Sequence, residues 1–245
     1  MSISNLDENI MYVLIHSPLV GPLTWQLVRD EMARRGIEAI VLALIDHPNS
    51  TLAYWQQHAD SIAESLVQIP QDRSLVFVAH SGAGPLLPII RQSASHSAGA
   101  YIFVDAGIPR NNSSRLDLMK LENDQWAGQF QRSHLHGGRF PTWNEDDLRD
   151  VIPDVSLRRK LAAEINPRVL AFFTEPIPVF AGWPDAPCAY IKFSALYDWD
   201  FAHAKQAGWL VHEMDVGHFH MLVDPPFVTD ALVNAVRELR HRKTK

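Results

Sequence analysis

The stretch Ser-Leu-Val-Phe-Val-Ala-His-Ser-Gly-Ala-Gly, residues 74–84, decides the fold class. It begins as an apolar β-strand, turns at Ser81 and continues into helix-like sequence. A turn this sharp needs small residues on both sides of the serine, and Ala79 and Gly84 are among those that provide them. The pattern predicts a nucleophile elbow, in which Ser81 stands clear of the sheet and the N–H of Gly82 points at the reacting oxygen.

Two further polar residues follow apolar strands later in the chain. Asp198 closes an apolar run, and His218 follows the strand expected at residues 210–214. A serine, an acid and a histidine in this order, each past the C-terminal end of a strand, have the chain order of a Ser-His-Asp triad. We prefer Asp198 as the acid, while Asp105, which also ends a strand, and the nearby Asp200 stay open as alternatives.

Over nearly its whole length the chain resembles the α/β-hydrolases, and among them the small members that include plant methylesterases and hydroxynitrile lyases. Three blocks carry the resemblance: VLIHSPLVGPLTW at residues 13–25, the elbow at residues 79–84, and GHFHMLVDP at residues 217–225. They are similar to the oxyanion loop with its flanking strand and helix, the nucleophile turn, and the histidine block of the family. The resemblance is specific for the fold but much less specific for the reaction, because this fold occurs in esterases, thioesterases, lactonases, lyases and receptors.

Apolar strands alternate with helical patterns in the first hundred residues and again near the end, which predicts a mostly parallel α/β sheet with helices on both faces. The first strand is expected at residues 11–16, so the antiparallel hairpin that opens larger relatives is absent and about six strands remain. Between Asp105 and Pro187 the alternation stops. We therefore expect an α/β-hydrolase core of residues 1–105 and 187–245, and a helical cap of residues 106–186 inserted after the fourth strand. Weak helical periods in the cap fall at residues 116–130, 145–152, 156–165 and 168–173.

The cap segment is rich in aromatic residues, and a loop-rich insertion over the strand ends is where substrate selection is expected. The candidate pocket walls are Trp126, Phe130, Trp143, Phe172, Phe173, Phe180 and Trp183. Of these, Trp126, Trp143, Phe173 and Trp183 are the candidate substrate contacts. For each one the alternative is packing within the cap. Glu175 is expected to be a solvated or capping carboxylate.

The loop after the first strand departs from the family pattern. Relatives have His-Gly followed by a residue whose N–H completes the oxyanion hole, whereas this chain has His16-Ser17-Pro18, and proline has no N–H. The hole is expected to use Gly82 with Leu19 or with the Ser17 hydroxyl, or else to be incomplete. His16 and Pro18 are also candidate substrate contacts, although a structural role beneath the hole is expected for His16.

The composition and net charge limit the kinds of molecule that the protein is expected to bind and the compartment in which it is expected. The chain has 245 residues, of which 47% are hydrophobic, and a net charge of −6, which argues against nucleic acid or an anionic membrane as the main partner. Its one cysteine, Cys188, excludes an internal disulfide and fits a reducing compartment. Neither a secretion signal nor an apolar run of about 18 residues is present, so we expect a cytoplasmic protein.

Two His-x-His pairs, at residues 134–136 and 218–220, have no carboxylate or cysteine partners at a zinc interval. We therefore expect no metal and no cofactor.

Three functions fit these residues. The first is a serine hydrolase that cleaves an ester, thioester or lactone of a small apolar molecule, with Ser81 as nucleophile, His218 as base and Asp198 as the orienting acid. The second is a lyase or cyclase that uses the same three residues, which Pro18 favours. The third is a ligand-binding protein with an idle triad. A homodimer is left open by the sequence.

Overall fold

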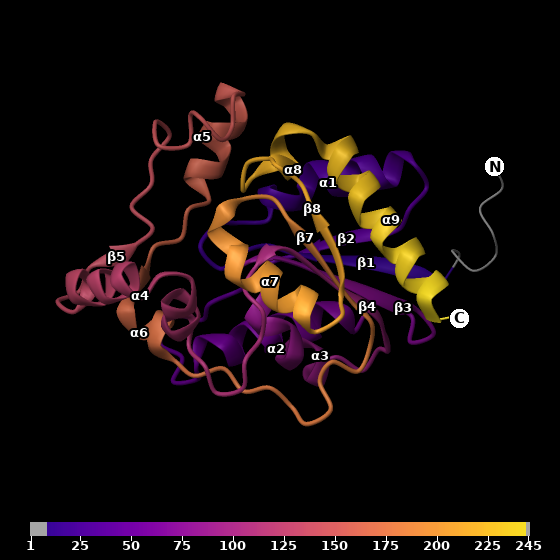
Figure 1. The fold of residues 1–245 in the computed structure, drawn as a ribbon, viewed down its shortest axis with the longest axis horizontal. Helices are drawn as coiled ribbons and strands as arrows, with labels where there is room; N and C mark the ends of the chain where they lie inside the picture. The colour runs from indigo at the N-terminus through magenta and orange to yellow at the C-terminus, as the bar shows by residue number, and fades with distance from the viewer. Residues whose placement is uncertain (1–8, 244–245) are drawn as a thin grey trace.

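A computed structural model describes residues 9–243 of the chain (Figure 1). Its centre is a parallel six-stranded sheet in the order β2-β1-β3-β4-β7-β8. The strands are β1 (Ile10–Ile15), β2 (Ala39–Leu42), β3 (Ser74–Ser81), β4 (Ala98–Ala106), β7 (Cys188–Lys192) and β8 (Leu210–Glu213). The predicted fold class, including the six strands, is confirmed.

Helices cover both faces of this sheet, because successive side chains of each strand point to opposite faces. Leu14 and Val76 belong to one core cluster, and their chain neighbours Val13 and Phe77 belong to the other. The first cluster is completed by α1 (Leu23–Arg34), α8 (His220–Val223) and α9 (Pro225–Lys243). The second is completed by α2 (Tyr54–Leu66), α3 (Leu87–Ser93) and α7 (Asp198–Gln206). Figure 1 shows α1, α8 and α9 above the sheet and α2 and α3 below it.

The helix after the elbow is short. A 3₁₀ turn at Gly84–Leu86 precedes α3, which has only seven residues. Pro88 lies in the first turn of α3, where a missing N–H leaves no intrahelical bond unmade.

The segment of residues 106–186 adds no strand to the six-stranded sheet. It contains α4 (Arg115–His134), β5 (Arg139–Phe140), α5 (Val155–Ala163), β6 (Arg168–Val169) and α6 (Leu170–Thr174), which lie to the left of the sheet in Figure 1. We call this segment the cap, and its status as a separate unit stays a prediction. Across residues 9–243, no helix is long and apolar enough to cross a membrane.

One helix expected in the cap is wrong. Residues 145–152 form turns instead of a helix. The side chain of Asn144 accepts a hydrogen bond from the N–H of Asp146 at 2.8 Å, and Asp147 accepts one from the N–H of Asn144 at 2.9 Å. These bonds have the pattern of a helix start, but a backbone bond that follows, from the N–H of Arg149 to the carbonyl oxygen of Asp146 at 3.1 Å, spans three residues and closes a turn.

A substitution at Gly84 tests the close packing between the elbow and Gly107. A Cβ added at Gly84 would lie 2.1 Å from the carbonyl oxygen of Gly107, so we expect Gly84→Ala to lower the free energy of unfolding by about 2 kcal/mol or more. Gly128→Ala is the matched control, because a Cβ there meets only the flexible end of Arg132 at 3.3 Å, and alanine favours a helix by up to about 1 kcal/mol. Urea unfolding of both variants measures the difference. Equal stabilities would show that the elbow tolerates a wider separation from Gly107.

Candidate active site

Ser81 is the last residue of β3, and its backbone has the left-handed conformation that an elbow requires. Its φ is +57°, which is rare for a residue with a side chain. The N–H of Gly107, which follows the neighbouring strand β4, donates to the carbonyl oxygen of Ser81 at 3.2 Å. The strained turn is thus held from the side by the adjacent strand.

His218 contacts Asp105. The two residues form a hydrogen bond of 2.7 Å between Nδ1 and Oδ2. Asp105 is fully buried and also accepts the N–H groups of Phe193 and Ser194, each at 2.9 Å, and the Ser194 hydroxyl at 2.6 Å. Burial alone would raise the pKa of Asp105, but the hydrogen bonds from His218 and Ser194 outweigh it and hold that pKa below its usual value. Asp105 also has a positive φ of +44°, so this position carries backbone strain as Ser81 does.

The expectation that Asp198 orients His218 is therefore corrected. Asp198 is the first residue of α7, its side chain is 59% exposed, and it forms an ion pair with Lys192. Asp105 holds the imidazole because β4 lies directly beside β3, which ends at Ser81. The other alternative, Asp200, is buried and accepts the N–H of Ile108 at 2.7 Å.

Tyr197 is a site residue that sequence reasoning missed. Its hydroxyl lies 3.0 Å from Ser81 Oγ, and its ring stacks on the imidazole of His218 with centroids 5.8 Å apart. Burial raises the pKa of Tyr197, so its phenol stays protonated at neutral pH. In this structure Ser81 Oγ is bonded to Tyr197 rather than to His218. The only sequence signal was the place of Tyr197 immediately before Asp198.

The three residues predicted for the oxyanion hole lie close together. The N–H of Leu19 points at Ser17 Oγ, with a separation of 3.4 Å. Ser17 Oγ is in turn 3.4 Å from the position that a Cβ on Gly82 would take. Pro18, Leu19, Ser81 and Gly82 all line the same cavity.

His16 has a structural position and no place on the cavity wall, which corrects its assignment as a substrate contact. Its Nε2 accepts the N–H of Leu44 at 3.2 Å, so its Nδ1 carries the proton and donates to the carbonyl oxygen of Ser17 at 2.8 Å. Burial is the main reason that the pKa of His16 falls to about 4. His80, directly before the nucleophile, also packs within the core, where its Nε2 lies 3.0 Å from the carbonyl oxygen of His218.

A cavity of about 670 Å³ opens over Ser81 and His218. Three of the four predicted aromatic contacts, Trp126, Trp143 and Phe173, line it together with Pro18. Trp183 does not line it, and this assignment is corrected. Its ring packs against Tyr101 with centroids 4.3 Å apart, in the second of the two core clusters described above.

The other cap aromatics divide in the same way. Phe172 and the previously unassigned Phe140 line the cavity, whereas Phe130 is buried in a cluster within the cap. Phe180 packs against Trp183 with centroids 5.8 Å apart. Within residues 9–243, no group of three or more histidine, cysteine, aspartate or glutamate side chains is arranged to hold a metal ion.

Comparison with known proteins defines the class of fold. No family model matches the chain, and no curated protein matches its sequence. Solved structures do match. An extracellular α/β-hydrolase from a Paenibacillus species, described as homologous in structure and function to tobacco salicylic acid binding protein 2, has a TM-score of 0.74 and 16% identity, covering 92% of this chain and 98% of its own.

Two further enzymes match over similar lengths. Polyneuridine aldehyde esterase has a TM-score of 0.66 and 16% identity, covering 93% of this chain and 99% of its own. Tomato methylketone synthase I, solved with 2-tridecanone, has a TM-score of 0.68 and 12% identity, covering 94% and 99%. This chain has the α/β-hydrolase fold, and its structure is similar to those of the Paenibacillus α/β-hydrolase and of polyneuridine aldehyde esterase.

The buried His16 predicts a pH dependence of stability. Its pKa in the folded protein, about 4, lies below the unfolded value of 6.5, so between these values only the unfolded state binds the proton, and stability falls as the pH falls. His16→Asn removes this contribution. We expect the unfolding free energy of the wild type to drop more steeply than that of the variant, by about 1.4 kcal/mol per pH unit between pH 6 and 4.5.

Urea titrations of both proteins across this range measure the two slopes. The raised pKa of Asp200, caused mainly by burial, acts in the opposite direction, but it is present in both proteins and cancels in the difference. Parallel slopes would show that His16 is protonated in the folded protein.

Proposed function

We propose that the protein is a serine hydrolase that cleaves an ester, thioester or lactone of a small, largely apolar molecule. The observation that carries the proposal is the buried Asp105–His218 hydrogen bond beside a strained Ser81, at the floor of an aromatic-lined cavity. A buried carboxylate, an imidazole and a serine at an elbow are the groups that acyl transfer uses.

The roles follow from the hydrogen bonds. Since Nδ1 of His218 donates to Asp105, Nε2 carries the lone pair and serves as the general base. Ser81 turns from Tyr197 towards His218 by rotation about its Cα–Cβ bond, and then attacks the acyl carbon as His218 takes its proton. His218 returns that proton to the leaving group as its bond to the acyl carbon breaks, while Asp105 stabilises the imidazolium without itself becoming protonated. A water molecule, deprotonated by His218, then attacks the acyl-enzyme, and the proton returns to Ser81 as the carboxylic acid leaves.

The negative oxygen formed by this attack needs two donors. The N–H of Gly82 is the first, and the N–H of Leu19 takes the place of the one that Pro18 lacks. Ser17 Oγ, which lies 3.4 Å from the nitrogen of Leu19 and 3.4 Å from the place of a Cβ on Gly82, adds a hydroxyl that can rotate towards the oxyanion. The proposed oxyanion hole therefore has two backbone donors. One of them, Leu19, lies one residue further along the chain than the donor in the family pattern.

The cavity favours an apolar substrate. Its wall is formed mainly by aromatic and aliphatic side chains, and its volume of about 670 Å³ suits a small molecule. The similar structures named as an esterase and as an α/β-hydrolase support this reaction class through their fold alone.

A second candidate is a lyase or cyclase reaction without an acyl-enzyme. It is favoured by the hydrogen bond between the hydroxyls of Ser81 and Tyr197, because in this position Ser81 Oγ is not hydrogen-bonded to His218, the base that would activate it as a nucleophile. His218 would then move a proton between substrate atoms. A structural neighbour named as a synthase is compatible with such chemistry on this fold.

A fluorophosphonate probe tests the nucleophile. We expect the wild-type protein to be labelled at Ser81, and Ser81→Ala to be unlabelled and inactive while keeping its fold, because the elbow accepts a smaller side chain. Intact-mass spectrometry and peptide mapping measure the labelling. A folded wild type that is not labelled would reject the hydrolase and favour the lyase, cyclase or ligand-binding alternatives.

The acid is tested by comparing two substitutions. We expect Asp105→Asn to slow probe labelling and ester hydrolysis by about 10³-fold or more, because the amide selects the wrong tautomer of His218. Asp198→Asn is the control and should change both rates less than threefold, since Asp198 contacts Lys192 at the surface. The reverse ranking would restore Asp198 as the acid.

A further inference from the structure

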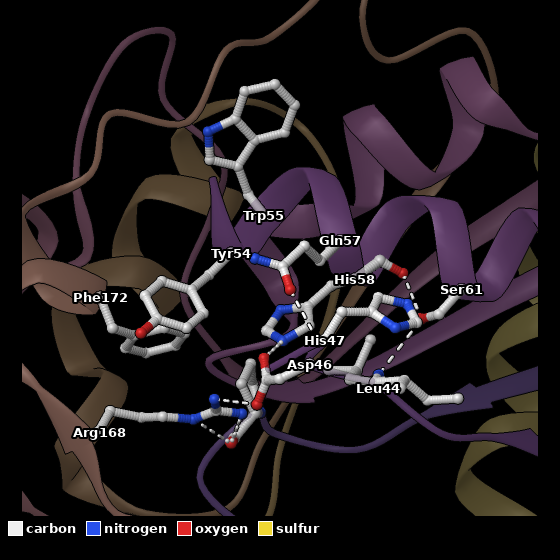
Figure 2. A network of polar contacts seen from close by, with 12 residues as sticks. Leu44, Asp46, His47, Tyr54, Trp55, Gln57, His58, Ser61, Arg168 and Phe172 are labelled. Carbon is white, nitrogen blue, oxygen red and sulfur yellow. Dashed lines mark hydrogen bonds and ion pairs between the residues drawn. The ribbon is translucent and has the colours of Figure 1, made fainter. Parts of the chain in front are cut away.

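Arg168, a cap residue in β6, reaches the loop that contains Pro18. Its Nε and Nη2 both donate to the carbonyl oxygen of Pro18, at 3.1 and 2.9 Å. Its side chain is only 6% exposed, and its Nη1 forms an ion pair with Asp46 (Figure 2). A buried guanidinium with a fixed partner on each side has little freedom to move.

These contacts fix the direction of a neighbouring N–H. The Pro18–Leu19 peptide is trans, and the C=O and N–H of a trans peptide lie in one plane and point in opposite directions. Since Arg168 holds the C=O of Pro18, the N–H of Leu19 is directed away from Arg168. On that side it meets Ser17 Oγ, next to Gly82. The donor proposed for the oxyanion hole is thus aimed by the guanidinium behind it.

Asp46 is itself hydrogen-bonded to a residue of the core. Its Oδ1 lies 2.8 Å from Nε2 of His58, a buried residue of α2 (Figure 2). Burial would raise the pKa of Asp46, but His58 and Arg168 together hold it at about 2. Asp46 therefore stays charged near neutral pH, and Arg168 has a permanent counter-ion.

The same cap segment contacts the loop at Leu19 and the helix that follows the loop, α1, at its first residue. Asn166 donates its backbone N–H to the carbonyl oxygen of Leu19 at 2.9 Å, and Glu164 accepts the N–H of Leu23 at 2.9 Å. Glu164 directly follows α5 and Arg168 begins β6, so the short connection between these two elements contacts the oxyanion loop and the start of α1 at three residues.

We propose that Arg168 is a positioning residue for the oxyanion hole. It holds the Pro18–Leu19 peptide so that the N–H of Leu19 points away from the guanidinium and towards Ser17 Oγ, beside Gly82, and it makes this geometry depend on the position of the cap. The loop needs such an external support because Pro18 supplies no N–H and the donor role passes to Leu19. The catalytic part of the inference rests on the proposed hydrolase function, whereas the structural part does not.

The test compares Arg168→Met with Arg158→Met. Arg158 is a matched control, because it is also a buried cap arginine and donates to the backbone carbonyls of Ile152 and Pro153, away from the loop. Two quantities are measured: hydrogen exchange of the Leu19 amide by NMR, and the kinetics of ester hydrolysis and fluorophosphonate labelling.

For Arg168→Met we expect exchange of the Leu19 amide to rise at least tenfold. We also expect kcat and the labelling rate to fall by about 10²-fold, with KM changed less than threefold, as for loss of one oxyanion donor. Arg158→Met should leave all of these near the wild-type values. If Arg168→Met does not fold, Arg168→Lys replaces it, since lysine keeps the charge but not the two-donor fork, and a smaller change in the same direction is expected.

Unchanged Leu19 exchange in the Arg168 variant would overturn the proposal. So would faster exchange with unchanged kcat and labelling in a protein whose wild type is labelled, because Leu19 would then play no part in the oxyanion hole. If the wild type is never labelled but Leu19 exchange rises only in the Arg168 variant, the positioning by Arg168 holds and the hydrolase function is what fails.

Discussion

The hydrogen bond between Asp105 and His218 is the interaction on which the site depends. A carboxylate with no exposure must have its oxygens satisfied, and Asp105 achieves this with four donors from two parts of the chain. The end of β7 supplies the donors of Phe193 and Ser194, and the loop after β8 supplies His218. The same bonds that stabilise the buried charge therefore bring the C-terminal ends of three neighbouring strands together over Ser81.

The same type of hydrogen bond joins the cap to the core at three places. Three cap glutamates accept N–H groups at the N-termini of three core helices. Glu164 binds the N–H of Leu23 in α1, Glu175 binds those of Tyr54 and Trp55 at α2, and Glu122 binds those of Trp199 and Asp200 in α7.

None of these helices has a side-chain cap of its own at the N-terminus, so the cap supplies the acceptors and a negative charge at the positive end of each helix dipole. Glu175 thus acts as the capping carboxylate expected from the sequence. Arg115, also in the cap, pairs with Glu175 at 3.2 Å, and Arg168 of the cap pairs with Asp46 of the core, so the buried charges at this boundary lie in compensated pairs. The position of the cap therefore affects the geometry of the loop and helix ends that surround the active site.

The sequence by itself determined the features that depend on neighbouring residues. Strands buried on both faces read as continuous apolar runs, so the sheet could be predicted, and the small residues around Ser81 predicted the elbow. The tertiary structure decided which distant side chains meet. Asp105 and Asp198 both follow strands, and only the position of β4 beside β3 selects Asp105. Arg168 lies 150 residues from Pro18, and no local pattern connects them. Burial and strand order depend on the whole chain, and these decided the acid, the tyrosine beside Ser81 and the support of the oxyanion loop.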